Sequence, residues 1–377
     1  MPMKDRIVTW FIQYVIKPRR EIIDKPGFIV TTFTEQGCIT YLREIFLPEK
    51  LFEIIESMIV ERYGDQGRQT LYSAGKKFGY LYSSMSNFPT VNTVSTKEFI
   101  DFAYNLMRYI EITFAEQANH EINLDEKMFT ARFTDYVVCR HNGLGYILME
   151  GGIAGIWSYA LQDKSLEGIQ LECQGKGNKN CYILCGHEKK IQEKTNKFFC
   201  ERDLPEYKFD SMYKALNEIQ PTKYTQMSMK KLLYAGFFEY IEGSFFYKKN
   251  RFFGCEAHIL YLLEQEIIKL NNGEQLLFDI CYEYGKELQE IYGSTDYQKF
   301  IIDFFSALGF GEVRVVDFNP LAIVAKFFPW SVYSERSKYI IFRGILSGFI
   351  SKATGQDIKF NNFEITVQKY LTLTIKA

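Results

Sequence analysis

The chain has 377 residues, of which 47% are hydrophobic and 16% aromatic, and its formal net charge is −1 at pH 7. This length and apolar content predict two domains, each with its own core. The near-neutral charge excludes the basic footprint that nucleic-acid-binding proteins carry. Because no signal peptide and no apolar run of about 18 residues is found, we expect a cytoplasmic protein whose eight cysteines are reduced.

The first half alternates between β and α patterns. Residues 1–26 predict an amphipathic helix that ends at the Lys-Pro-Gly sequence 25–27. Residues 27–43 predict a β-hairpin, because β-branched and aromatic residues flank a Glu-Gln-Gly turn. Pro48 opens a helix whose apolar residues recur every three or four positions. Further along we expect helices at residues 66–82, 96–111 and 151–159, and strands at residues 111–114, 127–138, 168–173 and 181–185.

A charged stretch at residues 188–229, with a helix at 209–219, separates this half from a second domain at residues 230–377. Residues 244–247 are the expected counterpart of the first hairpin. The order of hairpin, helices, strands, helix and strands predicts an α+β domain with helices on one face of an antiparallel sheet.

Sequence blocks of the first half recur in the same order in the second. YILMEGGIAGIWSY (146–159) corresponds to SKYIIFRGILSGFIS (337–351), and each block carries a Gly-x-x-x-Gly pair, Gly151/Gly155 and Gly344/Gly348. Blocks that begin at residues 53 and 99 correspond to blocks that begin at 264 and 300. A repeat of about 150 residues predicts tandem domains rather than a solenoid. We therefore expect two copies, at 27–187 and 230–377, arranged as a pseudo-dimer.

Only the first copy has a cysteine-flanked loop, CQGKGNKNC, between Cys173 and Cys181, and the second copy has Thr366 where the first has Cys173. The Gly-x-x-x-Gly helix, a spacer of about 20 residues and this loop together resemble the 4-vinyl reductase domain family. The resemblance implies a predicted hydrocarbon-binding or small-molecule sensor domain. It also implies a fold related to the acyl-chain-binding subunits of the trafficking (TRAPP) particles.

The resemblance also implies a metal site in the first copy. In metal-bearing members, zinc is held by the two loop cysteines, an acid three residues before the first, and a cysteine five residues before the first helix glycine. Cys173 and Cys181 match, whereas Gln170 and Tyr146 occupy the other two positions. A structural zinc usually has four ligands. Candidates for the missing ligands are Glu150, one helical turn from Tyr146, and Cys139 or His141 if their loop folds back.

We therefore expect at most one zinc per chain, in the first domain. The alternative is a glycine-rich hairpin with two buried thiols, since free cysteine is among the most buried residue types. No phosphate-binding loop, dinucleotide fingerprint, His-Glu-x-x-His or Gly-x-Ser-x-Gly motif is found, which favours a non-enzymatic role.

Aromatic and aliphatic residues on the expected helices and strands predict a narrow apolar pocket in the first copy. The expected lining residues are Phe99, Phe102, Leu106, Phe129, Phe133 and Trp157. This pattern favours a binding protein for a small hydrophobic molecule, a sensor or carrier that signals through a protein partner and is compatible with homo-oligomers. Two alternatives stay open: an interaction scaffold with solid cores, and an accessory protein of tetrapyrrole or hydrocarbon metabolism.

Overall fold

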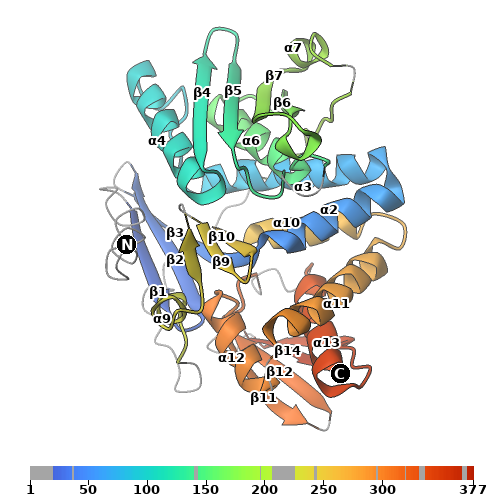
Figure 1. The fold of residues 1–377 in the computed structure, drawn as a ribbon. Coiled ribbons are helices and arrows are strands. Elements are labelled where there is room, and N and C mark those ends of the chain that lie inside the picture. Colours follow the sequence, from blue (N-terminus) through green and yellow to red (C-terminus); the bar gives the residue numbers. More distant parts are fainter. Residues whose placement is uncertain are drawn as a thin grey trace.

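A computed structural model describes residues 20–35, 38–139, 143–195, 197–205, 226–241, 244–293, 296–318, 320–330, 336–366 and 372–377 (Figure 1). These residues form three antiparallel sheets with helices packed against them, so the predicted α+β class is confirmed. No helix in the described part of the chain is both long and apolar enough to cross a membrane.

The first half of the chain contains the elements β1 (Arg20–Lys25), β2 (Phe28–Glu35), β3 (Cys38–Pro48), α2 (Glu49–Tyr63), α3 (Asp65–Met85), α4 (Thr96–Phe114), β4 (Gln117–Asn123), β5 (Met128–Thr134), α6 (Ile147–Ala160), β6 (Leu166–Glu172), the short 3-10 helix η1 (Gln174–Lys176), β7 (Cys181–His187) and α7 (Glu188–Gln192). The second half contains α9 (Met229–Tyr234), β8 (Glu239–Ile241), β9 (Ser244–Tyr247), β10 (Asn250–Glu256), α10 (His258–Ile267), α11 (Gly273–Tyr292), α12 (Tyr297–Ala307), β11 (Glu312–Phe318), β12 (Leu321–Lys326), α13 (Ile340–Thr354), β13 (Asn362–Thr366) and β14 (Thr372–Lys376).

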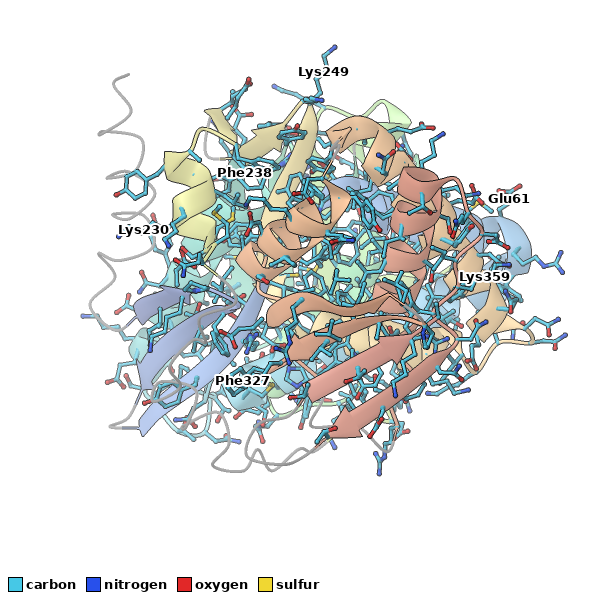
Figure 2. The ribbon with its side chains drawn as sticks, turned by 90° about the horizontal axis from the view of Figure 1, so that it is seen from below. Glu61, Lys230, Phe238, Lys249, Phe327 and Lys359 are labelled. Atoms are coloured by element: carbon cyan, nitrogen blue, oxygen red, sulfur yellow. The ribbon has the colours of Figure 1, made fainter. Side chains whose placement is uncertain are left out.

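The two halves share one six-stranded sheet of order β1-β2-β3-β10-β9-β8. Each half adds a four-stranded sheet, β4-β5-β7-β6 in the first and β11-β12-β14-β13 in the second, and the two have the same strand order. Figure 1 shows these four-stranded sheets at opposite ends of the molecule, with the shared sheet and helices α2, α3 and α10 between them. Phe327, labelled in Figure 2, directly follows β12, and its ring centroid lies 4.9 Å from that of Phe28 at the start of β2.

In both halves, two long helices pack so closely that glycines are required at their contact. α3 packs on α6, and α11 packs on α13. A Cβ atom at Gly155 would lie 2.1 Å from the carbonyl oxygen of Lys76, and one at Gly348 would lie 1.8 Å from that of Tyr282. Gly79 meets the backbone of α6 in the same way. The close approach that the Gly-x-x-x-Gly pairs predict is present in both halves.

A buried glutamate binds the first turn of the glycine-bearing helix in each half. Glu56 accepts a hydrogen bond from the Leu148 amide at 2.8 Å, and Glu264 accepts one from the Ile341 amide at 2.9 Å. These contacts satisfy amides that have no partner within their own helix. The two glutamates therefore occupy equivalent positions. The structure matches residue 264 to residue 56, whereas the sequence blocks match it to residue 53, three positions earlier.

The pairing of β3 with β10 is symmetric. Phe252 pairs with Pro48, and Glu256 pairs with Glu44. The residue offset that places Glu264 on Glu56 also places Phe252 on Glu44 and Glu256 on Pro48. Exchange of the two halves therefore converts each pair into the other, as a two-fold axis between two like units would. The domain boundaries at 187 and 230 and the pseudo-dimer stay predictions, and the helix expected at 209–219 lies outside the described residues.

Three expected elements are wrong. Residues 20–25 form strand β1 instead of the end of a helix, because β2 offers them an antiparallel partner along their whole length; residues 1–19 lie outside the described part. Residues 111–114 belong to α4, whose apolar spacing continues to Phe114, which packs 5.7 Å from Phe253 between ring centroids. The strand expected at 127–138 ends at Thr134, because Asp135 and Val138 have positive φ values of 53° and 67°.

Candidate functional site

An apolar pocket lies between α4, α6 and β5 in the first half. Its lining residues are Phe99, Phe102, Ala103, Leu106, Met107 and Ile110 of α4, Phe129 of β5, and Ile153, Ile156, Trp157 and Ala160 of α6. The space that a water-sized sphere can reach inside is about 20 Å³. About 10–15 Å³ of such space is enough for one water molecule. The pocket therefore has room for about one water molecule and is closed to an organic ligand in this conformation.

Five of the six residues expected from the sequence line this pocket. The Trp157 ring of α6 packs against rings of the other two elements, 5.8 Å from the Phe99 ring and 5.1 Å from the Phe129 ring between centroids. Phe133 does not line it but stacks on Tyr136 at 4.4 Å. Sequence reasoning missed the contribution of Ile153 and its neighbours on α6, although their spacing of three or four residues carried the signal.

The outer face of α4 is open to solvent. Ile100 and Tyr104, one turn apart, are 44% and 58% exposed. The helix begins with a capping box, in which Glu98 accepts from the Ser95 amide at 2.9 Å and Ser95 Oγ accepts from the Glu98 amide at 3.3 Å. One amphipathic helix therefore separates the pocket from water.

Three cysteines form a second feature of this half. The sulfur atoms of Cys139, Cys173 and Cys181 all lie within 4.8 Å of one another, and all three residues are buried. The Gln170 side chain also contacts this group, since its amide lies 3.1 Å from Cys139 Sγ. Cysteine thiolates at this spacing can share one zinc ion, whose Zn–S distances are about 2.3 Å.

Local backbone geometry brings Cys139 to the two loop cysteines. The turn after β5 passes through Asp135 and Val138, and an extended strand there would carry Cys139 away. Arg251 of β10 holds the start of this turn, with its guanidinium 3.2 Å from the Asp135 carboxylate. On the other side, Gly175 is required, because a Cβ atom there would lie 2.0 Å from the Cys139 carbonyl oxygen.

The three thiols have different proton affinities. The thiols of Cys139 and Cys181 donate to Cys173 and lower its pKa to about 2, and the amides of Gly175 and Lys176 add to this effect. At Cys181 the contact with Cys139 lowers the pKa, but contact with Cys173 and burial outweigh it and raise the pKa to about 11. Burial raises the pKa of Cys139 well above its usual range. The close contact of the three sulfur atoms therefore favours loss of a proton from Cys173 before the other two.

The other expected metal ligands lie elsewhere. The Glu150 carboxylate is not part of the close group in the described residues. Burial raises its pKa to about 8, although the Gln170 backbone amide and the charge of Lys176 act in the opposite direction. His141 lies outside the described residues. The three thiols with Gln170 beside them fit a zinc site of three sulfur ligands and one further ligand.

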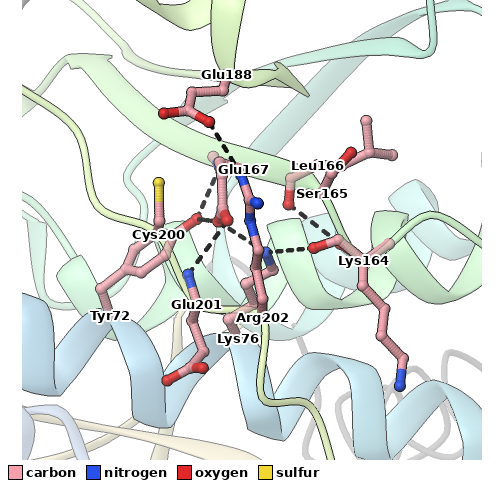
Figure 3. Close-up of polar contacts among 12 residues, drawn as sticks. Tyr72, Lys76, Lys164, Ser165, Leu166, Glu167, Glu188, Cys200, Glu201 and Arg202 are labelled. Carbon is pink, nitrogen blue, oxygen red and sulfur yellow. Dashed lines mark hydrogen bonds and ion pairs between the residues drawn. The ribbon is translucent and has the colours of Figure 1, made fainter.

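A third buried polar group joins α3 to β6 and to the segment after α7 (Figure 3). Lys76 Nζ lies 2.8 Å from Glu167 Oε2, and both side chains are fully buried. Tyr72 donates to the same carboxylate at 2.6 Å, and the Glu201 amide donates to its other oxygen at 3.2 Å. Lys76 also donates to the Lys164 carbonyl at 3.2 Å. These groups satisfy one another, which indicates a structural role.

The chain matches no protein-family model, and no curated protein is similar to it in sequence. Among solved structures, it is similar to the crystal structure of the phenol-responsive sensory domain of the transcription activator PoxR with phenol. The identity is 16%, the match covers 52% of this chain and 98% of that chain, and the TM-score is 0.32.

Proposed function

We propose that this protein binds a small apolar molecule in the pocket between α4, α6 and β5, as a sensor or carrier of the 4-vinyl reductase type. The observation that carries the proposal is a wholly apolar lining formed by three elements, with Trp157 among the lining residues. Burial of an apolar ligand there would add favourable contacts and leave no buried polar group without a partner.

Binding requires α4 to move outward, because the closed pocket has no room for a ring. Ile100 and Tyr104 on the outer face of α4 are 44% and 58% exposed, and the Tyr104 ring lies 5.8 Å from that of the surface residue His120 on β4, so the helix can shift without displacing a buried layer. A shifted α4 would change the surface that the protein presents to a partner. In this proposal a protein partner recognises the change in surface that accompanies the shift of α4.

The cysteine cluster would hold one zinc ion with Cys139, Cys173 and Cys181 as ligands and Gln170 as an adjoining oxygen donor, 3.5 Å from Cys139 Sγ. A bound zinc would keep the thiols deprotonated and would tie the loop of β6 and β7 to the turn after β5. We assign this zinc a structural role beside the pocket. The second half, which lacks the loop, would serve as the built-in partner of a pseudo-dimer.

Titrations of Trp157 fluorescence and of thermal stability with phenol, toluene and 1-octanol test the pocket. At about 0.8 kcal/mol per buried CH₂, a ligand of eight carbons gains roughly 6 kcal/mol before the cost of association. We therefore expect dissociation constants in the micromolar to millimolar range.

Ala103→Leu, which fills the pocket from α4, should abolish the response, whereas Tyr104→Leu on the exposed face of the same helix should keep it. If none of the three compounds changes the fluorescence or the melting temperature of the wild type, the pocket is a solid core. That result would favour the alternative function, an interaction scaffold with solid cores, over ligand binding.

A further inference from the structure

The second half contains an open cleft that the proposed function does not use. It lies where α10 ends and α11 begins, and α13 and the segment before β13 form its other walls. Its volume is about 650 Å³. Leu270 and Phe278 give it an apolar wall, while Arg343 and Lys359 contribute positive charge.

Arg343 is the central group of this cleft. Its side chain comes from the first turn of α13 and is only 7% exposed. Nη1 donates to the Lys338 carbonyl at 3.0 Å, but Nε is buried without an acceptor. Within the described residues Nη2 also has no acceptor, and it is not among the buried atoms. Nη2 is therefore the atom of Arg343 that can donate a charge-assisted hydrogen bond to a ligand in the cleft.

The charge of Arg343 has no dedicated counter-ion in the described part of the chain. Glu264 and Glu274 are the acidic groups whose charges act on it, but neither forms an ion pair with it among the described residues. Glu274 instead forms an ion pair with Lys338. The guanidinium lies 5.3 Å from the ring centroid of Phe363 and 5.8 Å from that of Phe278, so aromatic rings rather than a carboxylate offset the cost of its burial.

The beginning of α11 adds further donors to the same cleft. This helix has 20 residues, and its N-cap residue Asn272 makes no side-chain cap. The amides of Glu274 and Gln275, in the first turn, have no acceptor within the described residues. Unsatisfied amides and the helix dipole both favour an anion there. Lys359, at an edge of the molecule in Figure 2, lines the same cleft.

We propose that this cleft binds a small organic carboxylate, with its charged group between Nη2 of Arg343 and the first turn of α11. The apolar part of the ligand lies against Leu270 and Phe278. A single negative charge fits better than a phosphate dianion, because the Glu274 carboxylate also lines the cleft and repels further charge.

Fluorine-19 NMR with 4-fluorobenzoate tests this site, because line broadening detects millimolar binding. We expect saturable broadening with the wild type, and at least tenfold weaker binding of the uncharged 4-fluorobenzamide. Arg343→Gln should weaken benzoate binding at least tenfold. Inorganic phosphate at the same concentration should displace less than half of the benzoate; complete displacement would overturn the choice of a carboxylate.

Two exposed variants keep the test valid if Arg343→Gln does not fold. Lys359→Ala should weaken benzoate binding severalfold, whereas Glu274→Gln should strengthen it severalfold, since it removes a repelling charge. Ala103→Leu in the first-half pocket should leave binding unchanged. Equal binding of the benzamide, or no effect of either exposed variant, would overturn the proposal.

Discussion

Several ionisable residues of this protein are buried, and the partners of each residue determine how much its burial lowers the stability of the fold. Lys76 and Glu167 are a fully buried ion pair, with Tyr72 donating to the same carboxylate. Burial lowers the pKa of Lys76 and raises that of Glu167, while the opposite charge of the partner counteracts both effects. Glu56 and Glu264 are buried, and burial raises the pKa of both to about 8, although hydrogen bonds from backbone amides act in the opposite direction.

Lys76→Met should destabilise the protein by about 3–5 kcal/mol, because it leaves the Glu167 carboxylate buried without its counter-charge. The double variant Lys76→Met/Glu167→Gln should recover part of this loss, since a neutral amide removes the buried charge, and its one oxygen still accepts a hydrogen bond from either Tyr72 or Glu201. Urea unfolding measures both. A double variant less stable than Lys76→Met alone would contradict the importance of the pair. Lys286→Met, on an exposed pair, is the control.

Glu264 should make the protein less stable as the pH rises. Its folded-state pKa of about 8 lies above the usual 4.5, so the folded protein keeps a proton that the unfolded chain loses. The stability from this group is therefore complete below about pH 4.5 and is lost as the pH rises towards 8. Glu264→Gln keeps the acceptor for the Ile341 amide and should flatten the decline in melting temperature between pH 5 and 8. Exposed Glu61→Gln should show the wild-type profile.

At the scale of elements, the helix pairs α3–α6 and α11–α13 depend on glycine at the contact. The atoms that a Cβ would meet belong to the backbone of the facing helix, so no side-chain rotation can make room. The motif that marks both halves in the sequence is thus a packing requirement. The same contact places the first turn of α6 beside the cysteine cluster and its last turns beside the apolar pocket.

Gly155→Ala and Gly348→Ala should each cost about 1–3 kcal/mol in urea unfolding, because the added methyl group must separate two helices. Gly186→Ala is the matched control: its Cβ would meet only Met128 Cγ at 3.3 Å, and that side chain can move. Wild-type stability of Gly155→Ala would show that α3 and α6 are less closely packed than described.

At the scale of the whole molecule, contacts between the halves support the candidate sites. β3 and β10 join the halves in one sheet, and Lys77 of α3 pairs with Glu266 of α10 at 2.9 Å. Arg251 of the second half holds the turn that carries Cys139. The cysteine cluster of the first half is therefore positioned in part by the second.

Metal analysis of the purified protein should find one zinc per chain. Cys139→Ser, Cys173→Ser and Cys181→Ser should each remove most of it, because a site with two thiolates binds zinc far more weakly. Buried Cys281→Ser, outside the cluster, should retain the metal. Full zinc content in Cys139→Ser would exclude that residue as a ligand, and full content in all three variants would place the metal elsewhere.

The sequence by itself determined the elements whose signals are local. Apolar spacing predicted α2, α3 and α6, the turn residues predicted the hairpin of β2 and β3, and the glycine pairs predicted the close helix contacts. The loop motif pointed to Cys173 and Cys181, and the apolar pattern pointed to five of the eleven residues that line the pocket.

Only the tertiary structure decided the features that depend on residues far apart in the chain. Residues 20–25 are a strand because β2 lies beside them, and Cys139 joins the cluster because two residues with positive φ turn the chain and Arg251 holds that turn. The closed state of the pocket depends on how α4 packs, and the cleft around Arg343 depends on where α11 begins relative to α13. Local propensity is a property of neighbouring residues, whereas pairing and packing depend on partners that no local pattern specifies.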